Sequence, residues 1–450
     1  MKKWIPITAG VAVVVLAGGW YAAGTVAVSK TEEALAGARE ALGPEGMLEH
    51  GTVTRAGFMS ASVPALSLRT ADGIEVESGR FTAGGLGALS ADMDSVRMTL
   101  PDQGTFRVER LTLDGVTQDV QAPPGRGIRV GSLVFHNVSG DSPEGDGTVS
   151  AGRITVEDVR AGVARVVSLR DGGFEGRTPD GPARLSLAYG EVRGVPVTEV
   201  ADFAPSNFAG AGLEGLEMTG PDGVTVTLGA FGIEDVAWDD GVLTGFRTVM
   251  EDFVVVPPPG EMPEEMAKLG YDTPPATEQA EAIWRFDPET SVARFESSSR
   301  SPKAVHAEFA VEAGNMAAFA DLSRARDESA VQAALGGMAR QAHLREVAMS
   351  VTDAGLIPRV VKAAAEEEGA DPAAFRDMLV SQARQMEAQL GLDNLGDSVA
   401  TLLREPGSTL SVRVAAREGR ELALPMLMMA MAAPNRLREA LEITISATEG

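Results

Sequence analysis

The amino-acid sequence predicts a membrane-anchored protein: an N-terminal transmembrane helix followed by a β-rich antiparallel sheet region and a C-terminal α+β region. Three observations lead to this fold class. Residues 4–28 carry no charge. From residue 48 to residue 256, apolar and polar residues alternate along short runs, which is typical of half-buried strands. In residues 277–450, similar runs are interspersed with segments whose apolar residues recur every three or four positions, as in amphipathic helices.

The uncharged segment 4–28 is long enough to cross a membrane. A hydrocarbon core of about 30 Å requires about 20 apolar residues in a helix. Lys2 and Lys3 precede the segment, so the positive-inside rule places residues 1–3 in the cytoplasm and the rest of the chain across the membrane. The residues expected to form the anchor and its aromatic belts are Trp4, Val13, Val14, Val15, Leu16, Trp20 and Tyr21.

A cleaved signal peptide is the alternative interpretation of this segment. Small residues such as Ala22 and Gly24 would suit a signal peptidase. The apolar core of a signal peptide, however, is typically about 7–15 residues long. The uncharged segment exceeds that length, and we therefore expect a retained anchor.

Two shorter segments separate the expected regions. A stalk helix is expected within residues 29–43, because Ser29 and Glu32 have the spacing of a capping box and Gly43 precedes a proline. A proline-rich linker is expected at 257–276, because proline within a central strand removes a ladder hydrogen bond. One or two helical turns are expected inside this linker.

The composition restricts the classes of protein to which the chain can belong. Its 450 residues are enough for a sizeable core and for two or three domains. The absence of cysteine excludes disulfides, thiolate metal sites and cysteine nucleophiles. The net charge of −25 repels phosphate backbones and anionic membrane surfaces. We therefore expect no nucleic-acid partner.

Residues 48–256 are expected to form a long antiparallel meander. A loose repeat recurs here. It consists of an apolar residue, a residue of any type, a second apolar residue, two polar or turn-forming residues, and a valine. Its irregular spacing argues against a solenoid, and both internal duplication and ordinary hairpin patterning are open explanations. The repeat ends at Val116, Val138, Val159 and Val236.

The C-terminal region is expected to combine a sheet with helices. Alternating runs predict strands at 282–286, 291–296, 304–311, 344–352, 408–415 and 441–446. Asp371 followed by proline predicts the start of a helix that runs to Gly391. The expected buried face of this helix is Phe375, Met378, Leu379, Met386 and Leu390.

No motif in the sequence predicts a catalytic, cofactor or metal site. The histidines are scattered without ligand spacing, and neither a nucleophile elbow nor a zinc-binding His-Glu-x-x-His motif occurs. We therefore expect a protein that is not an enzyme and has no cofactor. The four histidines are His50, His136, His306 and His343.

Residues 422–433 are apolar on every side but too few to span a membrane. Buried packing against the C-terminal sheet is the ordinary explanation. The alternative is an adaptable lining for an acyl chain or a partner helix, because methionine side chains repack easily. The residues of this lining are Leu422, Met426, Met428, Met429 and Met431.

The order of these parts resembles the YdgA-like bacterial envelope proteins of unassigned function and, more distantly, the AsmA-like proteins. The likeness in the second half of the chain is carried by residues 269–299 and 351–375. The resemblance implies a sheet-rich periplasmic domain, tethered to the bacterial inner membrane, that handles lipid in a curved apolar groove. It supplies no catalytic residue.

We therefore expect a non-enzymatic role in envelope maintenance, with lipid as the expected ligand. The alternative is a protein-interaction scaffold that uses an exposed sheet edge to add a partner's strand.

Overall fold

The structure is a computed structural model in which the chain forms two compact units, Met1–Asp222 and Gly223–Gly450. The described residues are 27–57, 60–71, 73–84, 88–101, 104–118, 128–141, 147–160, 163–178, 180–196, 208–258, 260–325, 328–417, 422–423 and 441–450.

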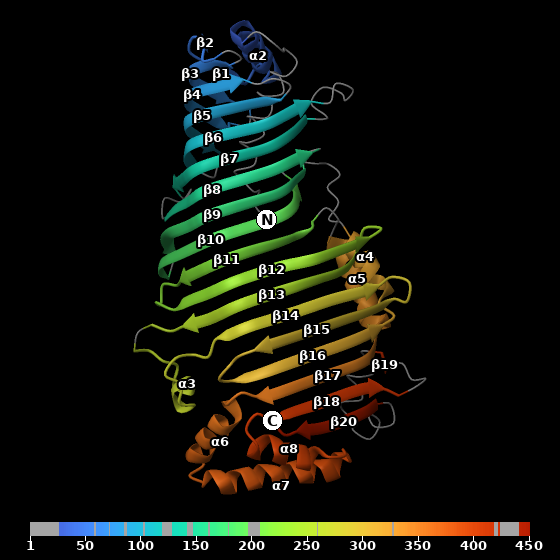
Figure 1. The fold of residues 1–450 in the computed structure, drawn as a ribbon. Coiled ribbons are helices and arrows are strands. Elements are labelled where there is room, and N and C mark those ends of the chain that lie inside the picture. The colour runs from blue at the N-terminus through green and yellow to red at the C-terminus, as the bar shows by residue number, and fades with distance from the viewer. Residues whose placement is uncertain are drawn as a thin grey trace. The chain divides into compact units, whose positions relative to one another are not determined.

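The first unit is an antiparallel meander in which strands pair in chain order from β3 to β11 (Figure 1). Two short strands, β1 and β2, both pair with β3. The predicted antiparallel sheet region is thus confirmed. The strands are β1 (Met47–Glu49), β2 (Thr54–Arg55), β3 (Ser60–Arg69), β4 (Glu75–Gly84), β5 (Leu89–Leu100), β6 (Gly104–Gln118), β7 (Ile128–Asp141), β8 (Gly147–Arg160), β9 (Val163–Thr178), β10 (Gly181–Pro196) and β11 (Gly210–Thr219).

Helix α2 (Ala27–Ala41) packs against β1, β2 and β3. Leu35 and Ala38 are buried there, and Arg39 donates a hydrogen bond of 2.8 Å to the carbonyl of Leu48. The expected cap at Ser29 is wrong, because the helix already includes Ala27 and Ser29 therefore lies inside it.

The residues expected to anchor the chain, from Trp4 to Tyr21, lie outside the described residues. Among the described residues, no helix is both long and apolar enough to cross a membrane.

In each of the strands β3 to β11, backbone pairing is interrupted at one residue, and these residues lie opposite one another from strand to strand. We call this line of residues the crease. On alternate strands the crease residue has a positive φ, from 51° at Asn137 to 61° at Gly215. Such left-handed residues bend a strand, and Asn, Asp and Gly adopt this conformation at least cost. The crease residues are Ala65, Gly79, Ser95, Glu109, Asn137, Gly152, Asp171, Ala188 and Gly215.

The loose sequence repeat coincides with bends of this kind. Each of its valines follows a residue with positive φ, and all four positions lie within strands rather than in hairpin turns. The repeat therefore marks points where a strand bends, which accounts for its irregular spacing. The left-handed residues are Gly115, Asn137, Asp158 and Asp235.

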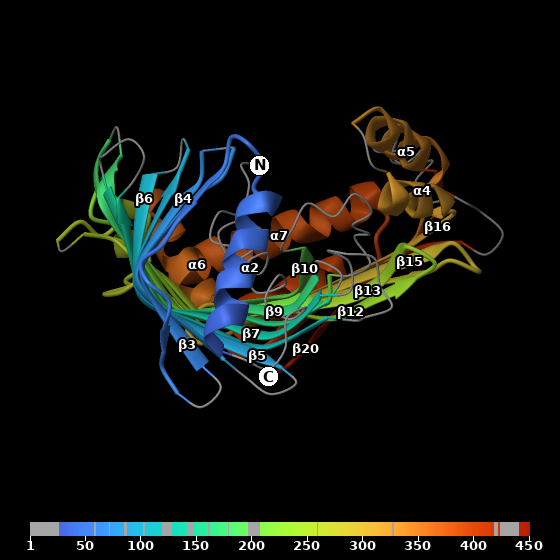
Figure 2. The same ribbon diagram turned by 90° about the horizontal axis from the view of Figure 1, so that it is seen from above.

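The bend brings the two arms of the sheet in the first unit towards each other, as Figure 2 shows for β3 to β7. Apolar side chains cover the inner face of both arms and form the main core. On one arm, paired residues continue this face across ten strands. They are Leu48, Leu68, Val76, Met98, Phe106, Gly140, Val149, Phe174, Leu185 and Met218.

The second unit combines an antiparallel sheet with helices, which confirms the predicted α+β part. Strands pair in order from β12 to β18, β18 then pairs with β20, and β19 pairs with one end of β17. The strands are β12 (Thr225–Asp239), β13 (Val242–Val256), β14 (Thr277–Asp287), β15 (Val292–Arg300), β16 (Val305–Gly314), β17 (His343–Asp353), β18 (Thr409–Ala416), β19 (Leu422–Ala423) and β20 (Leu441–Thr448). The helices are α3 (Glu264–Lys268), α4 (Ala317–Arg324), α5 (Glu328–Gln341), α6 (Leu356–Glu367), α7 (Pro372–Leu390) and α8 (Leu395–Arg404).

The proline-rich segment 257–276 connects two neighbouring strands of one sheet, because β13 pairs directly with β14. It contains the short helix α3, as the sequence predicts. The Tyr271 hydroxyl donates a 2.7 Å hydrogen bond to the carbonyl of Lys303, and Arg359 donates one of the same length to that of Gly270. The division between the two units falls at residue 222, before this segment.

The buried face of α7 differs from the prediction. Val380 and Ala383 are buried, whereas Met378 and Met386 are 42% and 51% exposed. Helix α7 packs against α6 and α8, so the strip that faces those helices is buried, and sequence periodicity alone does not identify it.

Asp371 begins α7 as the sequence predicts. Its Oδ2 accepts hydrogen bonds from the backbone N–H groups of Ala373 and Ala374, at 3.0 and 3.1 Å. We expect Asp371→Ala to lower the free energy of unfolding by about 1 kcal/mol, because two helix N–H groups lose their acceptor. Urea denaturation followed by circular dichroism measures this change. The control Asp272→Ala, in an exposed loop, should change stability by less than about 0.5 kcal/mol.

Candidate functional site: the apolar face of the second sheet

The two faces of the sheet in the second unit have opposite chemistry. Along each strand, alternate side chains point to opposite faces, and the pairing register places residues of like character in rows. We call one side the apolar face. Its two central rows are Trp284, Phe295, Val311, Val347, Val414 and Ile443, and Ser297, Phe309, Met349, Val412 and Ile445.

The centre of the apolar face is open to solvent. Phe309 and Met349 are direct cross-strand partners, and they are 38% and 42% exposed. The ring of Phe295 lies 6.5 Å from that of Phe309, in an edge-on arrangement. Soluble proteins rarely expose contiguous apolar patches without a use for them, and these side chains lie in neighbouring central strands.

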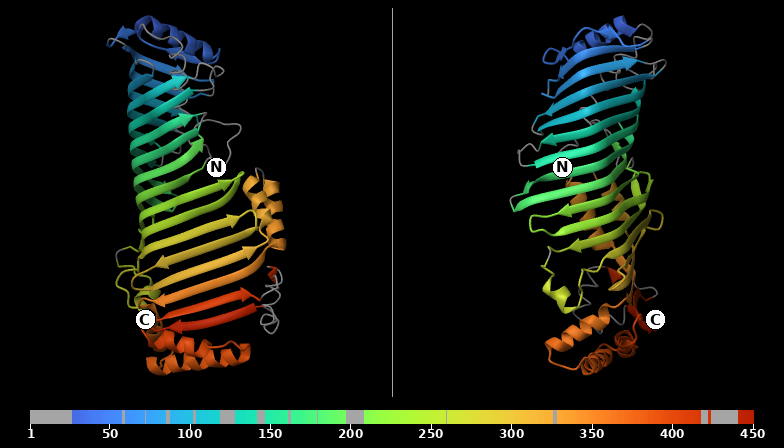
Figure 3. Two further views of the ribbon diagram at one scale, coloured as in Figure 1. Left: turned by 45° about the vertical axis from the view of Figure 1, so that its right-hand side comes forward. Right: turned by 60° about the vertical axis from the view of Figure 1, so that its left-hand side comes forward.

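In the part of the chain that the structure describes, helices cover the apolar face only towards its ends. Phe319 of α4 packs on Trp284 at 5.0 Å and on Phe286 at 5.1 Å, which forms a small separate core. At the other end α8 lies against β18 and β20, where Leu441 and Ile445 are buried. Figure 3 shows α4 and α5 beside the ends of their strands and α6–α8 next to β20. The middle strands β15 to β17 are left between them.

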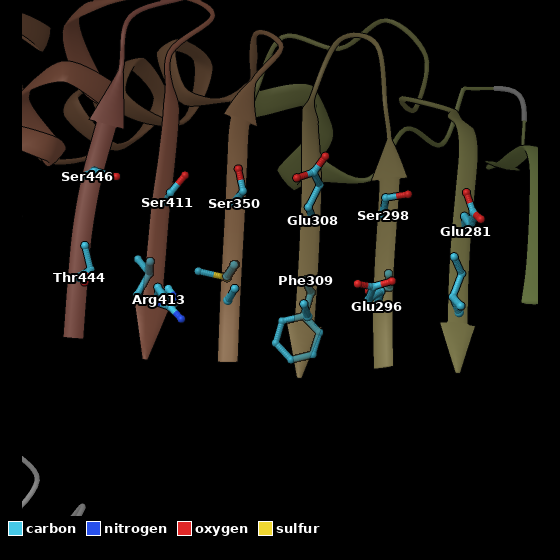
Figure 4. Close-up of a pocket in the computed structure, with 16 residues that line it drawn as sticks. Glu281, Glu296, Ser298, Glu308, Phe309, Ser350, Ser411, Arg413, Thr444 and Ser446 are labelled. Carbon is cyan, nitrogen blue, oxygen red and sulfur yellow. The ribbon is translucent and has the colours of Figure 1, made fainter. Parts of the chain in front are cut away.

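A shallow depression of about 540 Å³ crosses six strands from β14 to β20 (Figure 4). Most of its lining residues belong to the face opposite the apolar face, and Phe309 and Met349 also line it. Its floor is made of small side chains, including Ala310, Ala348 and Ser350, and Glu281, Glu296 and Glu308 also line it. One of its rows is Ser298, Glu308, Ser350, Ser411 and Ser446. We call this side the polar face, after its serine and glutamate side chains.

A two-pronged ion pair lies at the edge of this depression. The Arg413 guanidinium donates hydrogen bonds of 2.9 and 2.7 Å to the two carboxylate oxygens of Glu346. These hydrogen bonds hold the pKa of the Glu346 carboxyl below its usual range and raise the pKa of Arg413.

This pair predicts a small dependence of stability on pH. Because the pKa of Glu346 is lowered by folding, the pair contributes stability above the pKa of the unfolded carboxyl and loses it as pH falls through the folded value. We expect Glu346→Gln to lower the melting temperature by about 1–2 °C at pH 7, since the pair is partly exposed. The difference from wild type should disappear near pH 3. An equal difference at pH 3 and pH 7 would contradict this assignment.

The first unit contains an apolar cavity of about 150 Å³ on its inner face. Met98, Leu100 and Phe106 line it from one side of the crease, and Phe135 and Ile154 from the other. Cavities of this kind are too apolar to hold ordered water. Towards β11 the inner face becomes exposed, with Met218 at 45%.

The lining predicted at residues 422–433 is described only at its start. The backbone of Leu422 pairs with that of Leu344 in β17. Met426, Met428, Met429 and Met431 lie outside the described residues.

The exposed pair Phe309 and Met349 was missed by sequence reasoning. Alternation along 304–311 and 344–352 indicates one apolar face in each strand. Only the placement of the described helices shows that they leave the centre of this face exposed.

The histidines do not come together. His136 lies in β7, His306 in β16 and His343 in β17. In the described part of the chain, no three His, Asp or Glu side chains are placed to hold a metal ion.

Comparison with protein families gives a match to the second unit. A family model described as "Uncharacterized protein" matches residues 301–448. That segment runs from β16 to β20 and includes α4–α8, so it contains both Phe309 and Met349. No curated protein matches the chain.

Proposed function

We propose that the chain is a non-enzymatic lipid-binding protein of the bacterial cell envelope that holds acyl chains against the apolar face of its second unit. The observation that carries this proposal is the exposure of Phe309 and Met349 at the centre of a continuous apolar row. An acyl chain has no polar group along its length, so its recognition requires only apolar surface.

The energetics favour an occupant of this kind. Each methylene group that leaves water for an apolar surface contributes about 0.8 kcal/mol. Burial of the half-exposed aromatic and methionine side chains under a ligand is favourable for the same reason. The flexible side chain of Met349 also adapts to acyl chains of different shape. An open strip between α4 and α8 also allows a long ligand to enter from the side.

The inner face of the first unit supports the same proposal. Its apolar residues continue across ten strands, and a cavity of about 150 Å³ lies among them. Two surfaces suited to acyl chains in one chain are expected of a protein that handles lipid.

The sequence supports a location in the bacterial envelope as part of this proposal. The uncharged segment 4–28, preceded by two lysines, would tether the chain to the inner membrane and place the sheets in the periplasm. A body held close to a bilayer has a source of acyl chains beside it.

Site-specific photocrosslinking in cells tests the proposal. A photoreactive phenylalanine analogue in place of Phe309 should give lipid adducts that mass spectrometry identifies on the purified chain. The same analogue in place of Ser350, on the polar face, should give none. Protein adducts at position 309 would instead favour the scaffold alternative, and absence of any lipid adduct there would contradict lipid binding.

A further inference from the structure

The outer face of the first unit has a polar depression of about 770 Å³ over β8, β9 and β10. It lies on the side opposite the apolar core, because Ile154 and Val156 of β8 point inwards and their neighbours point outwards. Four arginines line it: Arg153, Arg165, Arg170 and Arg193. Such a concentration of positive charge is unexpected in a chain with a net charge of −25.

Two of these arginines belong to a row of basic residues that runs across neighbouring strands. Pairing places Arg110 opposite His136, His136 opposite Arg153, and Arg153 opposite Arg170. The next residue in the row is Tyr189. Like charges directly opposite each other destabilise a sheet. The opposition of Arg153 and Arg170 therefore costs stability, unless a negatively charged partner offsets the repulsion.

Two of the four arginines are neutralised by neighbouring carboxylates. Arg165 contacts Glu157 at 3.1 Å, and Arg193 forms an ion pair with Glu191. Among the described residues, no carboxylate lies within ion-pair distance of Arg153 or Arg170. The depression therefore keeps two exposed guanidinium groups in excess.

Arg170 is held in place by a chain of contacts. Its guanidinium lies 5.3 Å from the centre of the Tyr189 ring, a cation–π contact. The Tyr189 hydroxyl donates a 2.6 Å hydrogen bond to Glu191, whose side chain is 17% exposed. The hydroxyl and Arg193 hold the pKa of the Glu191 carboxyl below its usual range. Glu191 thus remains ionised at neutral pH and orients the ring that supports Arg170.

We propose that this depression binds a phosphate group through Arg153 and Arg170. Directly opposed residues in an antiparallel sheet have Cβ atoms about 4.5–5.5 Å apart, so both guanidinium groups reach the oxygens of one phosphate. The planar guanidinium donates two parallel hydrogen bonds to such an oxyanion. The phosphate is either the headgroup of a phospholipid or free in solution. The site is independent of acyl binding, since it lies on the outer face.

The test uses the full chain, purified in a maltoside detergent that contains no phosphate. Inorganic phosphate is titrated by calorimetry at constant ionic strength, with chloride as the competing anion. We expect the dissociation constant to rise at least about tenfold in the double variant Arg153→Gln, Arg170→Gln, because two charge-assisted contacts are lost.

The matched control is Arg177→Gln, Arg184→Gln, which removes the same charge from β9 and β10 outside the depression. It should change the dissociation constant less than about twofold. Circular dichroism spectra of both variants should match the wild type, since all four side chains are exposed. Neither variant should melt below the wild type by more than a few degrees, and loss of the Arg153–Arg170 repulsion should if anything raise the melting temperature of the first. Absence of phosphate binding to the wild type, or equal weakening in both double variants, would overturn the proposal.

A second titration identifies the source of the phosphate. Dihexanoyl phosphatidic acid is soluble and carries a phosphate headgroup. Binding at least about tenfold tighter than inorganic phosphate, and lost in the Arg153→Gln, Arg170→Gln variant, assigns the site to a phospholipid headgroup. Equal or weaker binding, with the same dependence on the two arginines, assigns it to free phosphate.

Discussion

Replacement of Phe135 by alanine is expected to lower the free energy of unfolding of the first unit by about 3–5 kcal/mol. Phe135 is 1% exposed and is among the largest fully buried side chains. It also lines the cavity of about 150 Å³. Its removal therefore enlarges an existing void, which the two arms of a bent sheet cannot close without moving the crease.

Urea denaturation measures this loss, and Phe309→Ala supplies the control. The same change of side chain is made there in the second unit, where the ring is 38% exposed, and we expect a loss below about 1 kcal/mol. Similar losses for the two variants would show that the inner face of the first unit is not a packed core.

Introduction of two aspartates on the apolar face should weaken lipid binding roughly ten- to fiftyfold. In the variant Phe309→Asp, Met349→Asp, two carboxylates occupy the centre of the row that is proposed to hold the acyl chain. Loss of contact with about two or three methylene groups, each worth about 0.8 kcal/mol, gives this range. Binding of a fluorescent phospholipid analogue to the purified full chain measures the effect.

The matched control places the same charges on the same two strands. Ala310→Asp, Ser350→Asp adds carboxylates to β16 and β17 on the polar face. Binding in this variant should stay within about twofold of wild type, because its charges never meet the acyl chain. If both variants bind lipid as the wild type does, or if both lose binding equally, the apolar face is not the site.

Features that depend on neighbouring residues in the sequence were predictable. The runs 96–100 and 106–113 alternate because one side of each strand is buried, and both lie in strands. Asp371 followed by proline fixes the start of α7, because both residues act on the first turn alone. Helix α2 was predicted for similar reasons, although the structure begins it before the predicted cap at Ser29.

Features that depend on distant residues were not predictable. The pattern of α7 allows several apolar strips, and only its packing against α6 and α8 selects Val380 over Met378. The proline-rich segment 257–276 interrupts the alternation of apolar and polar residues. A linker between domains and a loop between two paired strands would both do so, and the sequence therefore does not distinguish them. The exposure of Phe309 likewise depends on where α4 and α8 end, which its own strand does not encode.

The arginine row could have been suspected in part. Arg153 and Arg170 stand out as positive residues among alternating runs in an acidic chain. Their opposition, however, depends on the register between β8 and β9, and a shift of one residue would place them on different faces.

The crease has a consequence for the evolution of chain length. In the first unit a left-handed residue recurs on alternate strands, at Ala65, Ser95, Asn137, Asp171 and Gly215. The pattern of bends along the crease therefore repeats once per hairpin rather than once per strand. Duplication or deletion of a whole hairpin preserves this alternation of bends. Loss of a single strand instead places two left-handed residues on neighbouring strands and reverses the direction of every later strand. Homologues are accordingly expected to differ by even numbers of strands in this unit.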